Sequence, residues 1–394
     1  MNTIVIDGIF FQINEWSGIA KYWRNLLIDI DSHLSRNEGE DIKVILLVRG
    51  ESKSIRAHHY NKIQKFPIPF FDDRCAFSDY SYLGNICKDL GATAFISSYY
   101  SLAYGIPNIG MAYDYIPEHL NAMQSHPSWL LKQIYMQSIN CTLSISESTD
   151  RDTSTFYPNI QPTPNNIFYP RLKHDEFRFI SPAERGLLRK KYSLNYPFLS
   201  IVGHRGGYKN IHLLRSAAFM NTISHNPLPI GVVMSSGEEL TDEESNFYNQ
   251  FFLYGVKRLN LAEKDLTSLL SCSEMLFYPS LLEGFGYPIV EAMAQGCPVI
   301  TTGSTSIPEI LRHALSDEHI IVSGFDPSEA FNAIVSLMHT RIRVSSETRK
   351  RLENAFSTDN SKRFLDRVVD LSKTALPPLD EYLQTCLTLD GILS

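Results

Sequence analysis

The segment Met275–Thr302 reads MLFYPSLLEGFGYPIVEAMAQGCPVITT, and it decides the fold class. An apolar run ends at Tyr278, a glycine-containing loop follows, and a helical pattern runs over Pro288–Gln295. Gly296 ends this helix, and a second apolar run follows over Pro298–Thr302. A strand, a helix and a second strand in this order predict a βαβ unit with parallel strands.

The same alternation extends along the chain on both sides of this segment. The predicted strands are Thr3–Asp7, Ile42–Val48, Ala94–Ser98, Ile109–Ala112, Cys141–Ser146, Phe198–Val202 and Ile230–Met234. The predicted helices are Ile19–Leu34, Glu147–Phe156, one beginning at Ile211 and Glu263–Cys272, with helical periodicity over Asp326–Leu376. Between the two sets, Pro158, Pro162, Pro164 and Pro170 predict a linker, with the boundary between Tyr169 and Ser181. The sequence therefore predicts an α/β chain of two doubly wound, Rossmann-like domains.

Composition and charge narrow the class of function. The chain has 394 residues and a formal net charge of −7, which argues against dedicated nucleic-acid binding. Its 43% hydrophobic content is enough for two buried cores. The N-terminus has no basic segment typical of a signal peptide, and the six cysteines show no metal-ligand spacing. We therefore expect a cytoplasmic protein.

The loop after the strand that ends at Tyr278 carries the residues that could bind a ligand. A loop that joins the carboxyl end of a parallel strand to a helix N-terminus is where α/β sheets hold anionic ligands. Gly284 and Gly286 allow the backbone to approach a ligand closely. Glu283 and Glu291 can accept hydrogen bonds from sugar hydroxyls. The plainer alternatives are that Glu283 caps the helix and that Glu291 lies on the helix surface.

Seven residues separate Glu283 from Glu291 in EGFGYPIVEAMAQGCPVI, and this spacing resembles the EX7E signature of family-4 retaining glycosyltransferases with the GT-B fold. Four further segments are similar to that family: SGIAKYWRNLL, IVGHRGGYKN, DLTSLLSCSEMLFYPSLLEGFG and TTGSTSIPEI. The resemblance implies two Rossmann-like domains that face each other across a cleft. An acceptor-side domain would cover residues 1–175 and a nucleotide-sugar domain residues 176–358. A C-terminal helix, about 359–394, would pack back on the first domain.

The resemblance also implies a role for each matching residue. Glu283 would bind hydroxyls of the donor sugar, and Glu291 would hold the nucleotide ribose. Lys209 would neutralise the diphosphate. Gly284, Phe285 and Gly286 would give backbone contacts to the sugar and the phosphate, and Gly18 would let the first loop close over the diphosphate.

The sequence departs from the family pattern at two positions. His204 stands where the family often has arginine, and Arg205 comes one residue later. We expect Arg205 to hold the diphosphate and keep His204 as an alternative contact. In AYDYIPEHL, Tyr113 stands where the family commonly has histidine, so Asp114 is expected to act on the acceptor side. His119 is the next candidate there.

The resemblance implies a retaining hexosyltransferase that uses a UDP-sugar, with glucose as the first expectation. Its acceptor would be a polysaccharide or a lipid-linked glycan, and peripheral association with the inner face of the membrane stays open. We expect no metal and no other cofactor, because no DxD-like pair stands in a suitable loop. The alternatives are a UDP-sugar epimerase or a phosphorylase on the same fold, and a non-catalytic nucleotide-sugar-binding subunit. GDP in place of UDP and the oligomeric state are also left open.

Overall fold

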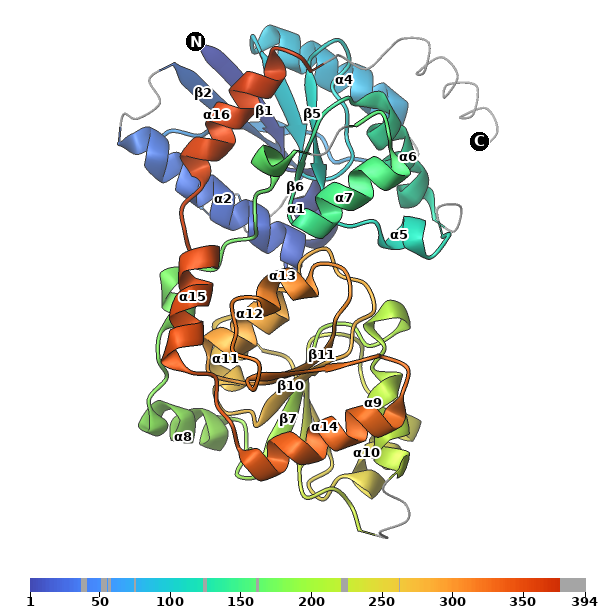
Figure 1. Ribbon diagram of the computed structural model, residues 1–394. Coiled ribbons are helices and arrows are strands. Elements are labelled where there is room, and N and C mark those ends of the chain that lie inside the picture. The colour runs from blue at the N-terminus through green and yellow to red at the C-terminus, as the bar shows by residue number, and fades with distance from the viewer. Residues whose placement is uncertain are drawn as a thin grey trace. The chain divides into compact units, whose positions relative to one another are not determined.

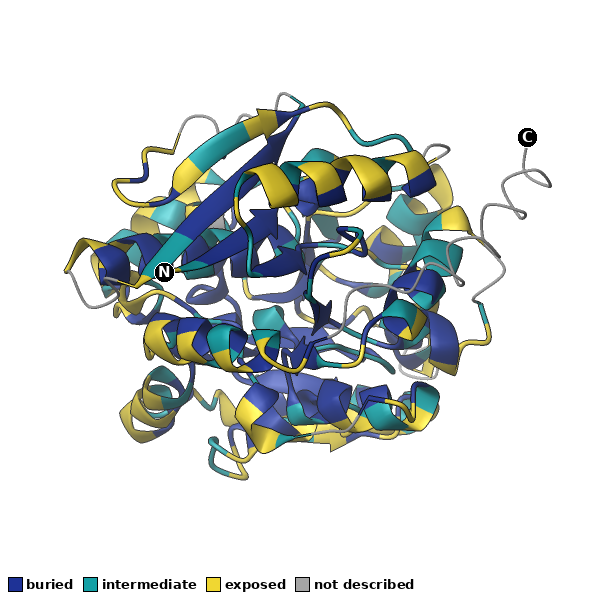
Figure 2. Ribbon diagram, turned by 90° about the horizontal axis from the view of Figure 1, so that it is seen from above, coloured by how far each residue is buried: buried dark blue, intermediate teal, exposed yellow. Residues whose placement is uncertain are grey.

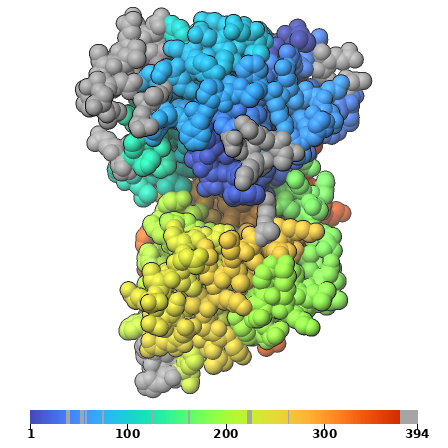
Figure 3. All heavy atoms as spheres, turned by 180° about the vertical axis from the view of Figure 1, so that it is seen from behind, coloured from blue at the N-terminus to red at the C-terminus, as the bar shows by residue number. Residues whose placement is uncertain are grey.

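A computed structural model describes the chain except for residues 37–40, 51–54, 56–57, 74–75, 123–125, 161–162, 221–225, 262 and 376–394. It divides into two compact units. The first unit contains Met1–Arg171 and Asp359–Ser394, and the second contains Leu172–Thr358. The division after Arg171 lies within the predicted linker region and slightly before the expected boundary at 175/176. In Figure 3, most blue and cyan atoms belong to the first unit, and the light-green to orange atoms belong to the second.

The first unit is built on a six-stranded sheet with the order β3-β2-β1-β4-β5-β6 (Figure 1). The strands are β1 (Asn2–Asp7), β2 (Ile42–Arg49), β3 (Gln64–Ile68), β4 (Ala94–Ser97), β5 (Asn108–Ala112) and β6 (Thr142–Ser144). Every neighbouring pair is parallel. This is the doubly wound order, in which the direction of winding reverses between β1 and β4.

Helices cover this sheet and complete the first unit. They are α1 (Ile9–Asn14), α2 (Gly18–Ser35), α4 (Ala76–Asp89), α5 (Ile116–His119), α6 (Pro127–Ser138), α7 (Glu147–Phe156) and α16 (Ser361–Ser372), with a 3-10 turn at Pro164–Asn166. The hydroxyl of Ser17 caps α2 by accepting from the Ala20 amide. The C-terminal helix α16 returns to pack on α2, where the rings of Phe364 and Trp23 meet edge to face. The residues after 375 in the predicted C-terminal helix lie outside the described residues.

The second unit repeats the same topology with the order β12-β11-β10-β7-β8-β9. The strands are β7 (Phe198–Val202), β8 (Gly231–Ser235), β9 (Val256–Leu259), β10 (Met275–Tyr278), β11 (Val299–Thr302) and β12 (His319–Val322). Its helices are α8 (Pro182–Lys191), α9 (His212–Phe219), α10 (Asp242–Phe251), α11 (Glu263–Leu270), α12 (Tyr287–Ala294), α13 (Ile307–Leu311), α14 (Pro327–Thr340) and α15 (Ser346–Phe356), with 3-10 turns at His174–Phe177 and Gly207–Lys209. All strand pairs are parallel, and the winding reverses between β7 and β10.

Burial follows the amphipathic pattern of the sequence. The strands in the middle of both sheets are buried, while most helices expose one face (Figure 2). The larger core of the second unit joins β7, β8 and β10 to α9 and α14 through Leu199, Val232, Phe277, Leu214 and Ile334. The apolar runs that predicted these strands are therefore explained by burial on both sheet faces.

The structure corrects the predicted organisation at several places. A short helix, α1, lies between β1 and α2 and was not predicted. The helical pattern over Asp326–Leu376 is three helices, and the first of them ends at Arg341, whose φ of 51° is left-handed. Edge strands β3, β9 and β12 were not predicted, because polar and half-exposed residues interrupt their apolar pattern.

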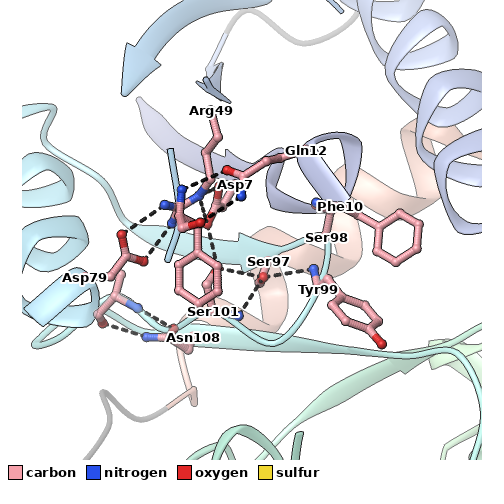
Figure 4. A network of polar contacts seen from close by, with 12 residues as sticks. Asp7, Phe10, Gln12, Arg49, Asp79, Ser97, Ser98, Tyr99, Ser101 and Asn108 are labelled. Atoms are coloured by element: carbon pink, nitrogen blue, oxygen red, sulfur yellow. Dashed lines mark hydrogen bonds and ion pairs between the residues drawn. The ribbon is translucent and has the colours of Figure 1, made fainter. Parts of the chain in front are cut away.

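A buried polar network joins the carboxyl ends of β1, β2 and β4 (Figure 4). The guanidinium of Arg49 donates to Asp7 and, through both terminal nitrogens, to Asp79 at 2.9 and 2.8 Å. The Ser101 hydroxyl donates to Asp7 Oδ2 at 2.6 Å. Arg49 and Asp7 are fully buried, so the network holds three strand ends together through charge-assisted hydrogen bonds.

Candidate functional site

The strongest candidate site lies at the point where the sheet of the second unit reverses its winding. Lys209 ends the 3-10 turn after β7, and Glu283 lies in the loop after β10. Lys209 Nζ lies 2.6 Å from Glu283 Oε1. Tyr278, the last residue of β10, donates to the same carboxylate oxygen at 2.6 Å and accepts from Lys209 Nζ at 3.1 Å. We call Lys209, Tyr278 and Glu283 the switch-point cluster.

Burial favours the protonated form of Tyr278 in this cluster. The exposed fractions of the Lys209 and Glu283 side chains are 16% and 9%, and Tyr278 is buried. Burial, and then the neighbouring Glu283 carboxylate, raise the pKa of Tyr278 well above its usual value. The phenol therefore stays protonated at neutral pH and acts as a hydrogen-bond donor. The ammonium of Lys209 also lies 5.2 Å from the ring centre of Tyr278, within cation–π distance.

The loop that carries Glu283 is held by residues of a neighbouring loop. The Glu283 amide donates to Thr305 Oγ1 at 2.9 Å, and the Ser306 hydroxyl donates to the carbonyls of Glu283 and Phe285. Gly286 then begins α12 with a φ of 107°, a left-handed conformation that favours glycine. The Phe285 side chain is buried, so only its backbone remains for contact with a ligand. These contacts within the protein hold the loop that carries Glu283.

The loop after β7 is tied to the loops after β10 and β12. The side-chain amide of Asn210 donates through Nδ2 to the carbonyls of Pro279 at 3.2 Å and Gly324 at 2.8 Å. The Leu281 amide donates to the Tyr208 carbonyl at 2.8 Å. These contacts fix the distance between the backbones that carry Lys209 and Glu283.

Arg205 and His204, the two predicted diphosphate contacts, bind the loop after β8 in this structure. The Arg205 guanidinium donates to the carbonyls of Glu238 at 2.8 Å and Glu239 at 3.1 Å, and pairs with Glu244 at 3.4 Å. His204 contacts the Glu238 carboxylate. Neither side chain contacts the switch-point cluster, so their role in holding a diphosphate stays a prediction.

The remaining predicted donor residues lie on two units. Glu291 lies on α12 with an exposed fraction of 5%, so it is not the surface helix residue of the plainer alternative. Gly284 lies between Glu283 and Phe285 in the loop described above. Gly18 is the first residue of α2, directly after the capping Ser17 in the first unit. Their predicted contacts with a donor stay predictions.

Tyr113 is a buried structural residue of the first unit. Its hydroxyl accepts from Trp23 Nε1 at 2.6 Å and donates to the Ser98 carbonyl at 2.9 Å. Burial raises the pKa of Tyr113 well above its usual value. The phenol is therefore a neutral group that joins the ends of β4 and β5 to α2.

Asp114 follows β5 and is only partly buried. Its Oδ1 accepts from the Ile116 amide at 3.1 Å, which fixes the turn before α5. Lys132, a residue of α6 with no predicted role, lies under this turn. Its ammonium donates to the Asp114 carbonyl and to Glu118 Oε2, both at 2.7 Å. His119, the alternative candidate, instead pairs with Asp152 at 3.0 Å.

A cavity of about 410 Å³ lies in the second unit beside the carboxyl ends of β11 and β12. Its lining includes Thr302, Ser304, Ser323, Phe325 and Glu329. None of the predicted site residues lines this cavity.

The described residues lack two features. They contain no group of three or more histidine, cysteine, aspartate or glutamate side chains placed to hold a metal ion. In the same part of the chain, no helix is long and apolar enough to cross a membrane.

The two doubly wound units place the chain in the class of proteins with the GT-B fold. The solved structure of sucrose-phosphate synthase from Thermosynechococcus elongatus matches with a TM-score of 0.68 and 14% sequence identity, covering 95% of this chain and 100% of that chain. At this identity the likeness shows the fold, and it confirms the predicted fold class.

Residues 200–340 match the family model described as Glycosyl transferases group 1, which confirms the resemblance found in the sequence. The matched segment contains Lys209, Tyr278, Glu283 and Glu291. The narrower assignment to family 4 and its EX7E signature stays a prediction.

Two curated relatives show how far the sequence similarity extends. The O-antigen chain mannosyltransferase B of Escherichia coli is 44% identical over 52 residues, which are 13% of this chain and 14% of that protein. The UDP-Gal:alpha-D-GlcNAc-diphosphoundecaprenol alpha-1,3-galactosyltransferase of Escherichia coli is 24% identical over 204 residues, 49% of this chain and 50% of that protein. The matches thus span at most half the length of these two relatives.

Proposed function

We propose that this chain is a retaining hexosyltransferase, which moves a sugar from a UDP-sugar to a polysaccharide or lipid-linked glycan without a metal. Glucose is the first expectation for the sugar. The observation that carries the proposal is the switch-point cluster, because it places a cation and a carboxylate in contact where doubly wound sheets bind nucleotides. The cluster also lies within the segment that matches the glycosyltransferase family.

The two charged groups suit the two ends of a nucleotide-sugar diphosphate. Within the described residues, Lys209 and Tyr278 both donate to Glu283 Oε1, which leaves Oε2 to accept from sugar hydroxyls. The Lys209 ammonium can exchange part of its contact with Glu283 for the more highly charged diphosphate. Glu291, one helical turn into α12, is assigned to the ribose by the family resemblance.

The reaction breaks the bond between the anomeric carbon and the diphosphate oxygen. Lys209 stabilises the negative charge that develops on the leaving group. The acceptor hydroxyl attacks from the same face as the departing diphosphate and transfers its proton to a phosphate oxygen. Asp114 would orient the acceptor hydroxyl or stabilise positive charge on the sugar. Arg205 would add a second cation at the diphosphate if it exchanged its contacts with the loop after β8.

The relatives support the donor and acceptor classes in general terms. The galactosyltransferase is named for a UDP-sugar donor and a diphosphoundecaprenol-linked acceptor. The mannosyltransferase is named for a different sugar. UDP and a glycan on a lipid carrier are therefore reasonable first substrates to test. A cytoplasmic enzyme that used a lipid-linked acceptor would act at the inner face of the membrane.

A nucleotide-release assay tests the proposal and its alternatives together. Purified protein is incubated in EDTA with UDP-glucose, UDP-galactose or GDP-mannose, with and without a lipid-linked glycan acceptor. A transferase releases the nucleoside diphosphate and forms a glycosylated product. Conversion of one nucleotide sugar to its isomer would indicate an epimerase, and binding without release would indicate a binding subunit. An absolute requirement for a divalent metal would contradict the metal-independent mechanism.

A further inference from the structure

Tyr278 occupies the centre of the switch-point cluster, although its residue type alone gave no functional signal. It is anchored at the end of β10 and is buried. Its hydroxyl has a single proton, and Lys209 is only a donor. The hydroxyl therefore accepts from Lys209 at 3.1 Å and directs its own proton to Glu283 at 2.6 Å. This gives the hydrogen bonds one direction, from Lys209 through Tyr278 to Glu283.

The two oxygens of the Glu283 carboxylate have different surroundings. Within the described part of the chain, its side-chain hydrogen bonds from Lys209 and Tyr278 both end on Oε1. Oε2 keeps its capacity to accept from a ligand. The orientation of Oε2 thus depends on the groups that hold Oε1.

Binding of a diphosphate would change one of these two holding groups. The Lys209 side chain is long and flexible, and a diphosphate competes with Glu283 for its ammonium. The Tyr278 ring is packed at the end of a central strand and has no such freedom. Only the tyrosine hydroxyl can therefore hold Glu283 both before and after a diphosphate arrives.

We infer that Tyr278 is a positioning residue, whose hydroxyl holds Glu283 Oε1 and so fixes Oε2 for the hydroxyls of the donor sugar. This inference rests on the proposed glycosyltransferase function. It assigns donor-sugar discrimination to Glu283 and Tyr278 together, and diphosphate binding to Lys209.

The test is the Tyr278→Phe variant, which keeps the ring and removes the hydroxyl. We expect kcat for sugar transfer to fall about tenfold, while the dissociation constant of UDP changes by less than about twofold. Tyr248→Phe is the matched control, because it removes another buried phenol from the same unit outside the cluster. It should leave both quantities unchanged.

A double-mutant cycle separates positioning from a general structural effect. If Tyr278 acts through Glu283, Tyr278→Phe should cause little further loss in a Glu283→Gln background. Independent, additive losses would overturn the inference, and so would full activity of Tyr278→Phe beside an active wild-type enzyme. If the wild-type protein neither binds nor turns over any nucleotide sugar, the proposed function fails and this inference fails with it.

A second variant keeps the inference testable if Tyr278→Phe does not fold. Lys209→Ala removes the other group that holds Glu283. Because Tyr278 remains, we expect the ratio of kcat/KM between UDP-glucose and UDP-galactose to stay within about twofold of the wild-type ratio. A ratio that collapses as far as in Glu283→Gln would show that Lys209 fixes the carboxylate, which overturns the inference.

Discussion

Lys209 Nζ and Glu283 Oε1 lie 2.6 Å apart although the two residues are 74 positions apart in the chain. They meet because β7 and β10 are parallel neighbours, so the loops that follow these two strands begin at the same edge of the sheet.

Replacing Lys209 by alanine should weaken UDP binding by about 1.5–3 kcal/mol, because a charge-assisted hydrogen bond to the diphosphate is lost. Isothermal titration in EDTA measures this change. Lys191→Ala is the control, since Lys191 is an exposed lysine of the same unit that pairs with Asp265. An unchanged dissociation constant in Lys209→Ala would contradict the assigned role.

Replacing Glu283 and replacing Glu291 should affect the binding of different parts of the ligand. Glu283→Gln should reduce turnover and sugar discrimination while UDP affinity survives, because only the sugar would contact this residue. Glu291→Gln should weaken UDP itself through the ribose. Parallel titrations with UDP and UDP-glucose check this difference, and equal effects of both variants on both ligands would show that the roles are wrongly assigned.

On the acceptor side, Asp114→Asn should lower transfer at least about tenfold, on the order of 1.4 kcal/mol, with nearly unchanged UDP affinity. Tyr113→Phe should affect turnover less. Its main effect should be on stability, because Trp23 and the Ser98 carbonyl lose a buried partner. Transfer rates and thermal unfolding of both variants measure this. Full activity of Asp114→Asn would show that another residue binds the acceptor. His119 would then be the next candidate, although it pairs with Asp152.

The buried network in the first unit should matter for stability. Arg49→Ala should lower the free energy of unfolding by about 3–5 kcal/mol, because it leaves Asp7 as a buried carboxylate without its cation. Urea unfolding measures the change. The exposed pair of Arg36 and Asp359 provides the control, and Arg36→Ala should have little effect. Similar unfolding curves for the two variants would contradict a stabilising role of the network.

The central strands could be predicted from the sequence because burial on both faces produces continuous apolar runs. The strands β7 and β10 have the predicted bounds, Phe198–Val202 and Met275–Tyr278. The edge strand β9 reads VKRL and is half-buried, so its pattern resembles a loop. Helix α10 was not predicted, because it is polar over most of its length; in the structure it begins with a capping box formed by Thr241 and Glu244.

The candidate site could be predicted only where a local motif carried it. Glu283 and Lys209 lie in motifs, and the structure brings them together. Tyr278 and Lys132 were missed, because an aromatic at a strand end and a lysine in an apolar helix look like ordinary packing until their partners are known. The contacts of Arg205 depend on a loop more than thirty residues away, which no local pattern specifies.

A crystal structure of the protein with UDP-glucose, grown in EDTA, tests the central claim most directly. We predict that the diphosphate lies within hydrogen-bond distance of Lys209, that a sugar hydroxyl donates to Glu283 Oε2, and that Tyr278 still donates to Oε1. A nucleotide sugar bound elsewhere, for example in the cavity beside Thr302 and Glu329, with the contact between Lys209 and Glu283 unchanged, would contradict the claim.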